Sequence, residues 1–335
     1  MSRLGWLAST ALAAAGALAT AGAPAYAADF SHDHIDVIVK ATTSQYWATV
    51  FDGADAASKA LGVSISKLGA SAETDVAKEV SIMENAIESK PTGIVIAATN
   101  AQALAKPIAN ATAAGIPVIV IDSDANTDKY VTFLATNNVT GGVKAADELA
   151  RCIKQRTGKD DGDVAYMTAL AGAQSLNDRD KGFVQELKKY PDLKIVDHRV
   201  GNNDPARALK DAEDILTSHP TLVGMFADNE LEGDGAGRAI QEKSLGSKMC
   251  AVAFDTSDQE IAFVRNGNLD ALIVQNPYMM GYAGVWYALA ASQGVVLPHY
   301  VDSGVHVVTK SNIDSKQMAG LLDPAKYQLT PFLGG

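Results

Sequence analysis

The sequence predicts an α/β protein made of two doubly wound parallel-sheet domains. Along most of its 335 residues, short runs rich in Val and Ile alternate with longer segments of helical periodicity. This alternation is typical of parallel sheets that helices cover on both faces. The units are too many for one compact sheet, and the same rhythm restarts near 136–138, where Thr140, Gly141 and Gly142 open a new helix. We therefore expect two domains that face each other.

Strands are predicted where apolar and β-branched residues run together between polar turns. They are expected at 35–39, 63–68, 93–98, 117–121, 130–135, 163–167, 193–198, 222–227, 249–254, 269–275 and 305–309. Helices are predicted where apolar residues recur every three or four positions among Ala, Lys and Glu. They are expected at 46–61, 74–89, 101–114, 142–154, 178–189, 205–218, 231–245, 256–265 and 279–293. The stretch after Asn312 carries no clear assignment.

The first residues have the pattern of a secretory signal peptide. Arg3 is the only charged side chain before Asp29, and an apolar, Ala-rich run follows it over 4–21. Ala25 and Ala27 place small residues where a signal peptidase needs them. The alternative is a membrane anchor, but the run is rich in Ala and Gly rather than Leu. We predict a signal peptide at 1–27 and a periplasmic mature protein.

Composition and motifs exclude several functions. The formal net charge of −11 argues against a nucleic-acid partner, since phosphate binding favours a basic surface. The glycines of 233–237 precede Asp255 at the spacing of a dinucleotide site, but they begin several residues after the strand ends, so close helix packing explains them better. No catalytic, metal or cofactor motif is expected. Two cysteines, Cys152 and Cys250, could form a disulfide in an oxidising compartment or remain free thiols.

Polar residues mark the carboxyl ends of the predicted strands, where ligands bind in sheets of this kind. These positions carry Lys40, Asp122, Thr136, Asp228, Asn229, Asp255 and Gln275. The helix after the first strand opens with Tyr46 and Trp47, an adjacent aromatic pair. Carboxylates and amides can hydrogen-bond neighbouring hydroxyl groups, while an aromatic ring covers an apolar C–H face. This chemistry suits a monosaccharide or another polyol.

Seven blocks, in the same order, make the chain similar to the periplasmic ribose-binding family of ABC transporter solute-binding proteins. The blocks are 35–54, 116–122, 134–142, 173–183, 226–230, 253–255 and 274–281. The resemblance implies sugar ligands at Asp122, Arg179, Asn229, Asp255 and Gln275, with aromatic contacts from Tyr46, Trp47 and Phe254. Three positions depart from the ribose-binding pattern, namely Lys40, Ala97 and Asn203. These departures put ribose in doubt and leave the polyol class intact.

The resemblance also implies the type I topology, two lobes joined by a three-crossover hinge. Crossovers near Thr136, 275–277 and 304–306 would divide the chain into an amino-terminal lobe of 28–136 plus 276–304 and a carboxy-terminal lobe of 137–275 plus 305–335. The implied function is the periplasmic component of an ABC importer, a monomer that closes on its sugar and is recognised by a membrane permease. The implied alternative is a receptor for a sugar-like signal, of the autoinducer-2 type or in chemotaxis.

The sequence leaves two roles open for each of Asp122 and Lys40. Asp122 could bind ligand or cap a helix. Lys40 could donate to a ligand hydroxyl, or it could pair with Asp122 or Asp255 in a structural salt bridge.

Overall fold

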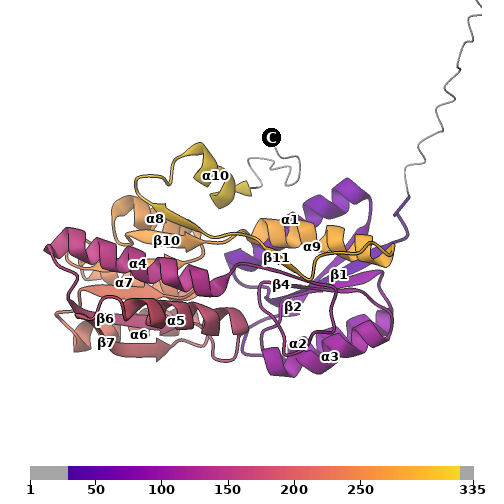
Figure 1. The fold of residues 1–335 in the computed structure, drawn as a ribbon, viewed down its shortest axis with the longest axis horizontal. Helices are drawn as coiled ribbons and strands as arrows, with labels where there is room; N and C mark the ends of the chain where they lie inside the picture. The colour runs from indigo at the N-terminus through magenta and orange to yellow at the C-terminus, as the bar shows by residue number, and fades with distance from the viewer. Residues whose placement is uncertain (1–28, 325–335) are drawn as a thin grey trace, which may run out of the picture.

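The computed structural model describes residues 29–324, which form two lobes lying end to end (Figure 1). The predicted signal peptide lies outside the described residues. Each lobe is built on a six-stranded sheet. The sheet of the amino-terminal lobe has the order β11-β5-β4-β3-β1-β2, with strands β1 (His34–Ala41), β2 (Ser64–Ala70), β3 (Gly93–Ile96), β4 (Val118–Ile121), β5 (Thr132–Ala135) and β11 (Tyr300–Asp302). The sheet of the carboxy-terminal lobe has the order β12-β10-β9-β8-β6-β7, with strands β6 (Gly162–Thr168), β7 (Leu193–Val200), β8 (Gly224–Ala227), β9 (Cys250–Phe254), β10 (Ala271–Val274) and β12 (His306–Thr309).

Helices cover both faces of the amino-terminal sheet. In Figure 1, α1 (Gln45–Leu61) and α9 (Pro277–Ser292) lie above the sheet, and α2 (Val76–Ser89) and α3 (Ala101–Ala113) lie below it. Every residue of β3 and β4 is therefore buried, which explains why these strands read as unbroken apolar runs. The predicted doubly wound fold is confirmed for this lobe.

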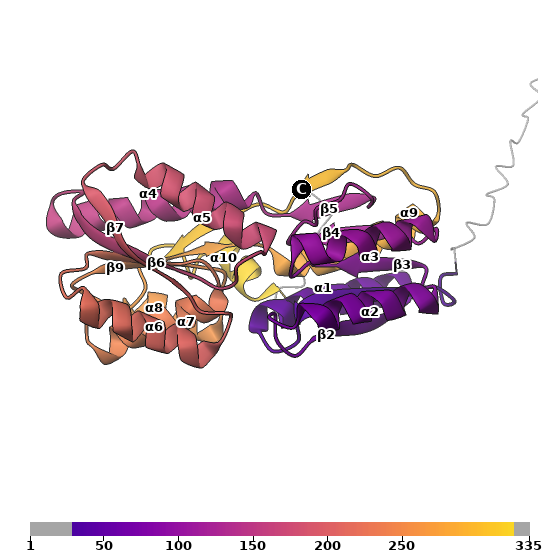
Figure 2. The same cartoon turned by 90° about the horizontal axis from the view of Figure 1, so that it is seen from below.

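The carboxy-terminal lobe has the same construction. In Figure 2, α4 (Asn138–Thr157) and α5 (Gln174–Leu187) lie on one side of the sheet, and α6 (Pro205–Ser218), α7 (Glu230–Glu242) and α8 (Asp258–Asn266) lie on the other. The segment that the sequence left unassigned forms α10 (Lys316–Leu322), and its Met318 joins the apolar core of this lobe together with Ile313. Residues 313–324 are thus part of the carboxy-terminal lobe.

The chain passes between the two sheets three times. The passages lie between β5 and α4, between β10 and α9, and between β11 and β12. All strand pairs are parallel except β10 with β12, which is antiparallel because the last strand re-enters its sheet directly from the neighbouring lobe. Sequence analysis did not predict β11, whose three residues Tyr-Val-Asp are too few to show a pattern.

Helix α4 begins earlier than predicted, at Asn138 rather than Gly142. Asn137 caps it by accepting from the backbone N–H of Thr140. Gly141 and Gly142 therefore lie inside the helix, where a side chain would not fit. A Cβ atom on Gly142 would overlap the backbone of Arg179 on α5, and one on Gly141 would overlap the ring of Phe254. The two glycines let α5 and β9 approach α4 closely.

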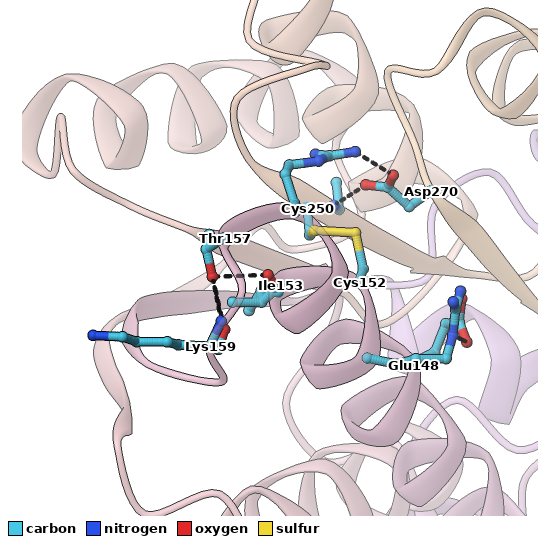
Figure 3. Close-up of a disulfide and its surroundings, with 10 residues drawn as sticks. Glu148, Cys152, Ile153, Thr157, Lys159, Cys250 and Asp270 are labelled. Carbon is cyan, nitrogen blue, oxygen red and sulfur yellow. Dashed lines mark hydrogen bonds and ion pairs between the residues drawn. A yellow bond between two sulfur atoms is a disulfide. The ribbon is translucent and has the colours of Figure 1, made fainter.

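Cys152 and Cys250 form a disulfide (Figure 3). It joins α4 to the start of β9 across 98 positions of sequence, and both cysteines are buried. Of the two states that the sequence left open, a disulfide or two free thiols, the structure has the disulfide. Among residues 29–324, no helix is both long enough and apolar enough to cross a membrane.

Candidate sugar-type binding pocket

A pocket lies between the two lobes at the carboxyl ends of their strands. The space between its side chains, counted with its opening, is about 380 Å³. Both lobes line it, through Lys40, Ser44, Tyr46, Trp47, Glu73 and Asp122 on one side and Ser175, Leu176, Arg179, Asn203, Asn229, Glu230, Leu231 and Asp255 on the other. This is the place where ligands bind in open α/β sheets.

On the amino-terminal side, Asp122 receives hydrogen bonds from two pocket residues. Lys40 Nζ lies 2.8 Å from Asp122 Oδ2, and the Tyr46 hydroxyl donates to Oδ1 at 2.8 Å. Burial alone would raise the pKa of Asp122, but Lys40 and Arg179 outweigh it, so that this pKa lies below its ordinary value. Burial, followed by the charge of Asp122, raises the pKa of Tyr46 well above its ordinary value. Asp122 is therefore an acceptor with its charge retained.

On the carboxy-terminal side, Asp255 lies between Arg179 and Gln275. Gln275 Nε2 donates to Asp255 Oδ1 at 2.6 Å, and Arg179 Nη1 lies 3.4 Å from Oδ2. The guanidinium of Arg179 also lies over the Phe254 ring, with its central carbon 3.8 Å from the ring centroid, and it donates to the backbone oxygen of Asp228. Burial raises the pKa of Asp255, and the longer contact with Arg179 compensates it less fully than Lys40 compensates Asp122.

Asp122 and Asp255 share a backbone feature. Asp122 has φ of 60° and Asp255 has φ of 76°, so both occupy the left-handed region directly after a strand. Aspartate tolerates this region better than most residues, and unusual backbone conformations of this kind concentrate at functional sites. The two carboxylates therefore enter the pocket from equivalent positions in the two lobes.

An aromatic pair forms one wall of the pocket. The Tyr46 and Trp47 rings meet edge to face with centroids 4.8 Å apart, and both residues are buried. Trp47 Nε1 donates to Glu73 Oε1 at 2.8 Å. This bond fixes the indole ring, and it also orients a carboxylate that lines the pocket.

The first turn of α7 supplies amide and carboxylate groups to the opposite wall. Asn229 caps the helix by accepting from the Glu232 N–H at 3.1 Å, and its Nδ2 donates to Asn203 Oδ1 at 2.7 Å. Glu230 crosses between the lobes and accepts from the backbone N–H groups of Gln45 and Tyr46. Asp122, for which the sequence also left helix capping open, caps none of the helices within residues 29–324, and its oxygens accept from Lys40 and Tyr46 instead.

Seven of the ten residues expected to bind ligand line this pocket: Lys40, Tyr46, Trp47, Asp122, Arg179, Asn229 and Asp255. The other three do not. The Phe254 ring packs against the Arg179 guanidinium, and Gln275 donates a hydrogen bond to Asp255; both support pocket residues without lining the pocket. The Thr136 hydroxyl bonds Ser303 Oγ at 3.0 Å and the Gly304 oxygen at 3.1 Å, which makes Thr136 part of the crossing segments rather than of the pocket wall.

Sequence reasoning missed Ser44, Glu73, Ser175, Leu176 and Leu231 as lining residues. Glu73 follows the carboxyl end of β2, so the same rule that singled out Asp122 could have found it. Ser175 lies in the first turn of α5 and contacts Ser123 Oγ at 2.5 Å in the other lobe. No residue pattern distinguishes such a serine from an ordinary helix start.

One group among residues 29–324 brings together atoms of the kinds that bind metals, namely Cys152, Cys250 and Asp270. Its two sulfur atoms are bonded to each other in the disulfide and cannot act as thiolate ligands.

Comparison with known proteins agrees with this geometry. Residues 35–295 match the family model of the periplasmic binding protein domain. A ribose import binding protein of Haemophilus influenzae is 28% identical over 255 residues, covering 76% of this chain and 84% of its own. Among solved structures, a carbohydrate transporter solute-binding protein of Agrobacterium radiobacter in complex with D-arabinose is 43% identical with a TM-score of 0.85, covering 87% of this chain and 98% of its own.

A second solved structure, an ABC transporter solute-binding protein of Agrobacterium vitis with bound D-fucose, is 35% identical with a TM-score of 0.82 and covers 86% of this chain and 99% of its own. The family model, the matching lengths and the two-lobed topology lead to one conclusion: this chain belongs to the periplasmic binding protein domain family.

Proposed function

We propose that this chain is the extracytoplasmic solute-binding component of an ABC importer and that it binds one monosaccharide or similar polyol between its lobes. The observation that carries the proposal is the pair of aspartates, Asp122 and Asp255, that reach one pocket from opposite lobes, each beside a cation. Two fixed acceptors on opposite walls suit a small molecule with hydroxyl groups around its ring. The D-arabinose and D-fucose complexes of the similar Agrobacterium proteins support the same class of ligand.

The pocket chemistry fits a polyol in three respects. Carboxylate and amide groups supply acceptors and donors, Arg179 offers the donors of Nη2 beside its bonded Nε and Nη1, and Tyr46 and Trp47 offer apolar edges. Each buried partner that a wrong ligand leaves unsatisfied costs about 1–3 kcal/mol, which gives the site its selectivity.

Binding would work by closure of a hinge. The lobes would be 28–136 plus 276–304 and 137–275 plus 305–335, moving about the three crossing segments. Contacts that exist only when the lobes meet, such as Ser123 with Ser175 and Tyr46 N–H with Glu230, favour the closed form. A ligand bonded to both walls shifts the balance further toward closure, and the closed shape is what a membrane permease recognises. The protein would act as a monomer and catalyse no reaction.

The test is a binding screen on the purified chain. Thermal shift against pentoses, hexoses and alditols, followed by isothermal titration calorimetry of the hits, should identify at least one monosaccharide with a 1:1 stoichiometry. D-arabinose and D-fucose are the first probes, because similar proteins bind them. If no sugar or alditol raises the Tm or releases heat, the proposed function is wrong.

A further inference from the structure

The charged side chains of the pocket do not balance. Two are cations, Lys40 and Arg179. Four are carboxylates, which belong to Glu73, Asp122, Glu230 and Asp255. Each cation already has an aspartate, with Lys40 at 2.8 Å from Asp122 and Arg179 at 3.4 Å from Asp255. Within residues 29–324, Glu73 and Glu230 therefore line the pocket without a basic side chain in contact.

Glu73 and Glu230 differ in the hydrogen bonds that their carboxylate oxygens accept. Both oxygens of Glu230 accept from backbone N–H groups, Oε1 from Gln45 at 3.0 Å and Oε2 from Tyr46 at 2.8 Å. Glu73 accepts one hydrogen bond through Oε1, from the Trp47 indole, and within the described part of the chain its Oε2 accepts none. Glu73 as a whole is 7% exposed, and this oxygen is not among the fully buried side-chain oxygens of the described residues that lack a partner, so it remains accessible. An oriented acceptor in the pocket is thus left for a ligand.

From this geometry, and resting on the proposed sugar-binding function, we infer that Glu73 is a specificity-determining residue that accepts a hydrogen bond from the ligand and makes the pocket reject anionic sugars. Trp47 is its positioning residue, because the indole N–H holds Oε1 in place and leaves Oε2 as the acceptor for the ligand. The ligand class is narrowed accordingly to neutral sugars, or sugars with an amino group, and excludes sugar acids and sugar phosphates.

The physical reason is the cost of bringing a further negative charge among buried carboxylates. An anionic ligand needs a cation that is free to pair with it, but Lys40 and Arg179 are both paired within the pocket. A hydroxyl group donates to Glu73 without adding charge. Burial raises the pKa of Glu73, and although Lys40 and the Trp47 hydrogen bond lower it, the rise prevails, with Asp122 and Asp255 adding to it. Another anion in the pocket would act in the same direction as the two aspartates.

The alternative is that Glu73 serves only to anchor Trp47. The substitution Glu73→Gln separates the two roles, since the amide oxygen of Gln can still accept from the indole while the charge is lost and one acceptor becomes a donor. If Glu73 were only an anchor, Glu73→Gln would bind sugars as the wild type does. Glu84→Gln is the matched control, because Glu84 is exposed on α2 and lies outside the pocket.

The experiment measures affinity by isothermal titration calorimetry on the full chain. The neutral probes are D-arabinose and D-fucose, and the anionic probes are D-galacturonate and D-ribose 5-phosphate. We expect the wild type and Glu84→Gln to bind the better neutral probe at least 100-fold more tightly than either anionic probe. We expect Glu73→Gln to bind that neutral probe about 10-fold to 100-fold more weakly, the effect of one lost hydrogen bond to a charged group, and to discriminate less against D-galacturonate. Its Tm should be no lower than that of the wild type, because a buried charge has been removed.

Two results would overturn the inference and leave the proposed function intact. One is wild-type affinity for an anionic probe equal to that for the neutral probe, which needs no variant. The other is a Glu73→Gln affinity for the neutral probe equal to that of Glu84→Gln. If the wild type binds no sugar at all, the proposed function fails and the inference fails with it.

Discussion

The Glu230 carboxylate lies 2.8 Å from the backbone nitrogen of Tyr46, and the two residues belong to different lobes. Tyr46 is in the first turn of α1, where backbone N–H groups have no partner within the helix. A carboxylate at this end of a helix also meets the positive end of its dipole. Glu230 therefore completes the start of α1 only when the lobes are together, in the manner of a helix cap supplied by another lobe.

This contact predicts that Glu230→Ala shifts the protein toward an open form. The two hydrogen bonds that the Glu230 carboxyl group accepts disappear, so we expect sugar affinity to fall about 10-fold to 100-fold. Removing this side chain also removes the cost of its burial, which raises the pKa of Glu230 to about 7, and this gain offsets part of the loss. Small-angle X-ray scattering of the ligand-free variant should give a larger radius of gyration than the wild type. Glu242→Ala, on the exposed end of the same helix beside Arg238, is the control and should change neither quantity. Unchanged affinity and radius in Glu230→Ala would show that the contact does not bias closure.

A second prediction concerns Asp255. Asp255→Asn keeps the backbone compatible with φ of 76° but removes the charge that Arg179 faces, while Asp255→Ala adds the cost of holding an alanine in the left-handed region, about 1–2 kcal/mol. We expect both variants to lose measurable sugar binding in calorimetry. Both should remain folded by circular dichroism, with the alanine variant melting at the lower temperature. Wild-type affinity in Asp255→Asn would remove Asp255 from the proposed site.

Sequence reasoning worked where a single rule of topology applied. Parallel sheets bring strand ends together, so Asp122 and Asp255 could be assigned to one pocket before any geometry was known. The same rule placed Thr136 in the pocket wall, but its hydroxyl bonds Ser303 and Gly304 of another crossing segment instead. The position of Glu73 after β2 could indicate that it lines the pocket. Its hydrogen bond with the Trp47 indole could not be predicted, because it joins two segments that are separate in the sequence.

The predicted start of α4 was wrong because it, too, depends on contacts between separate segments. The run Thr140, Gly141 and Gly142 predicts the opening of a helix, and the predicted helix begins at Gly142. In the structure, Gly142 is inside α4 because α5 approaches it too closely for any side chain. Tertiary packing decides such positions, and local sequence does not record it. The antiparallel entry of β12 likewise follows from the route of the chain between lobes rather than from the residues of the strand.

The Cys152–Cys250 disulfide yields a third prediction. It closes a loop across 98 positions, and a loop of about this length is expected to stabilise the fold by about 4–5 kcal/mol in the chain-entropy model, with typical measured values of about 2–4 kcal/mol. The double variant Cys152→Ser/Cys250→Ser should therefore unfold at a lower urea concentration. Its sugar affinity should be that of the wild type, because neither cysteine lines the pocket. Equal urea midpoints for the variant and the oxidised wild type would contradict the prediction.

The last prediction concerns the buried carboxyl group of Glu232. The side chain is fully buried, and neither of its oxygens has a hydrogen-bond partner in the described part of the chain. Burial, with further contributions from Glu73, Asp211 and Asp204, raises the pKa of Glu232 from 4.5 to about 8. A pKa that is higher in the folded state means that the stabilisation is complete below pH 4.5 and is lost as pH rises toward about 8.

Glu232→Gln should remove this dependence. The amide never ionises, so at pH 8 the variant avoids the cost of the buried charge and should be about 1–3 kcal/mol more stable than the wild type. Its advantage should shrink as pH falls toward 5, where the wild-type carboxyl group is also neutral. The measurement is the urea midpoint of wild type and variant at intervals between pH 5 and 9. Glu242→Gln, exposed on the same helix, should follow the wild-type curve. A variant that is less stable than the wild type at pH 8 would mean that the ionised carboxylate has a stabilising partner, and the proposed burial of an uncompensated acid would be wrong.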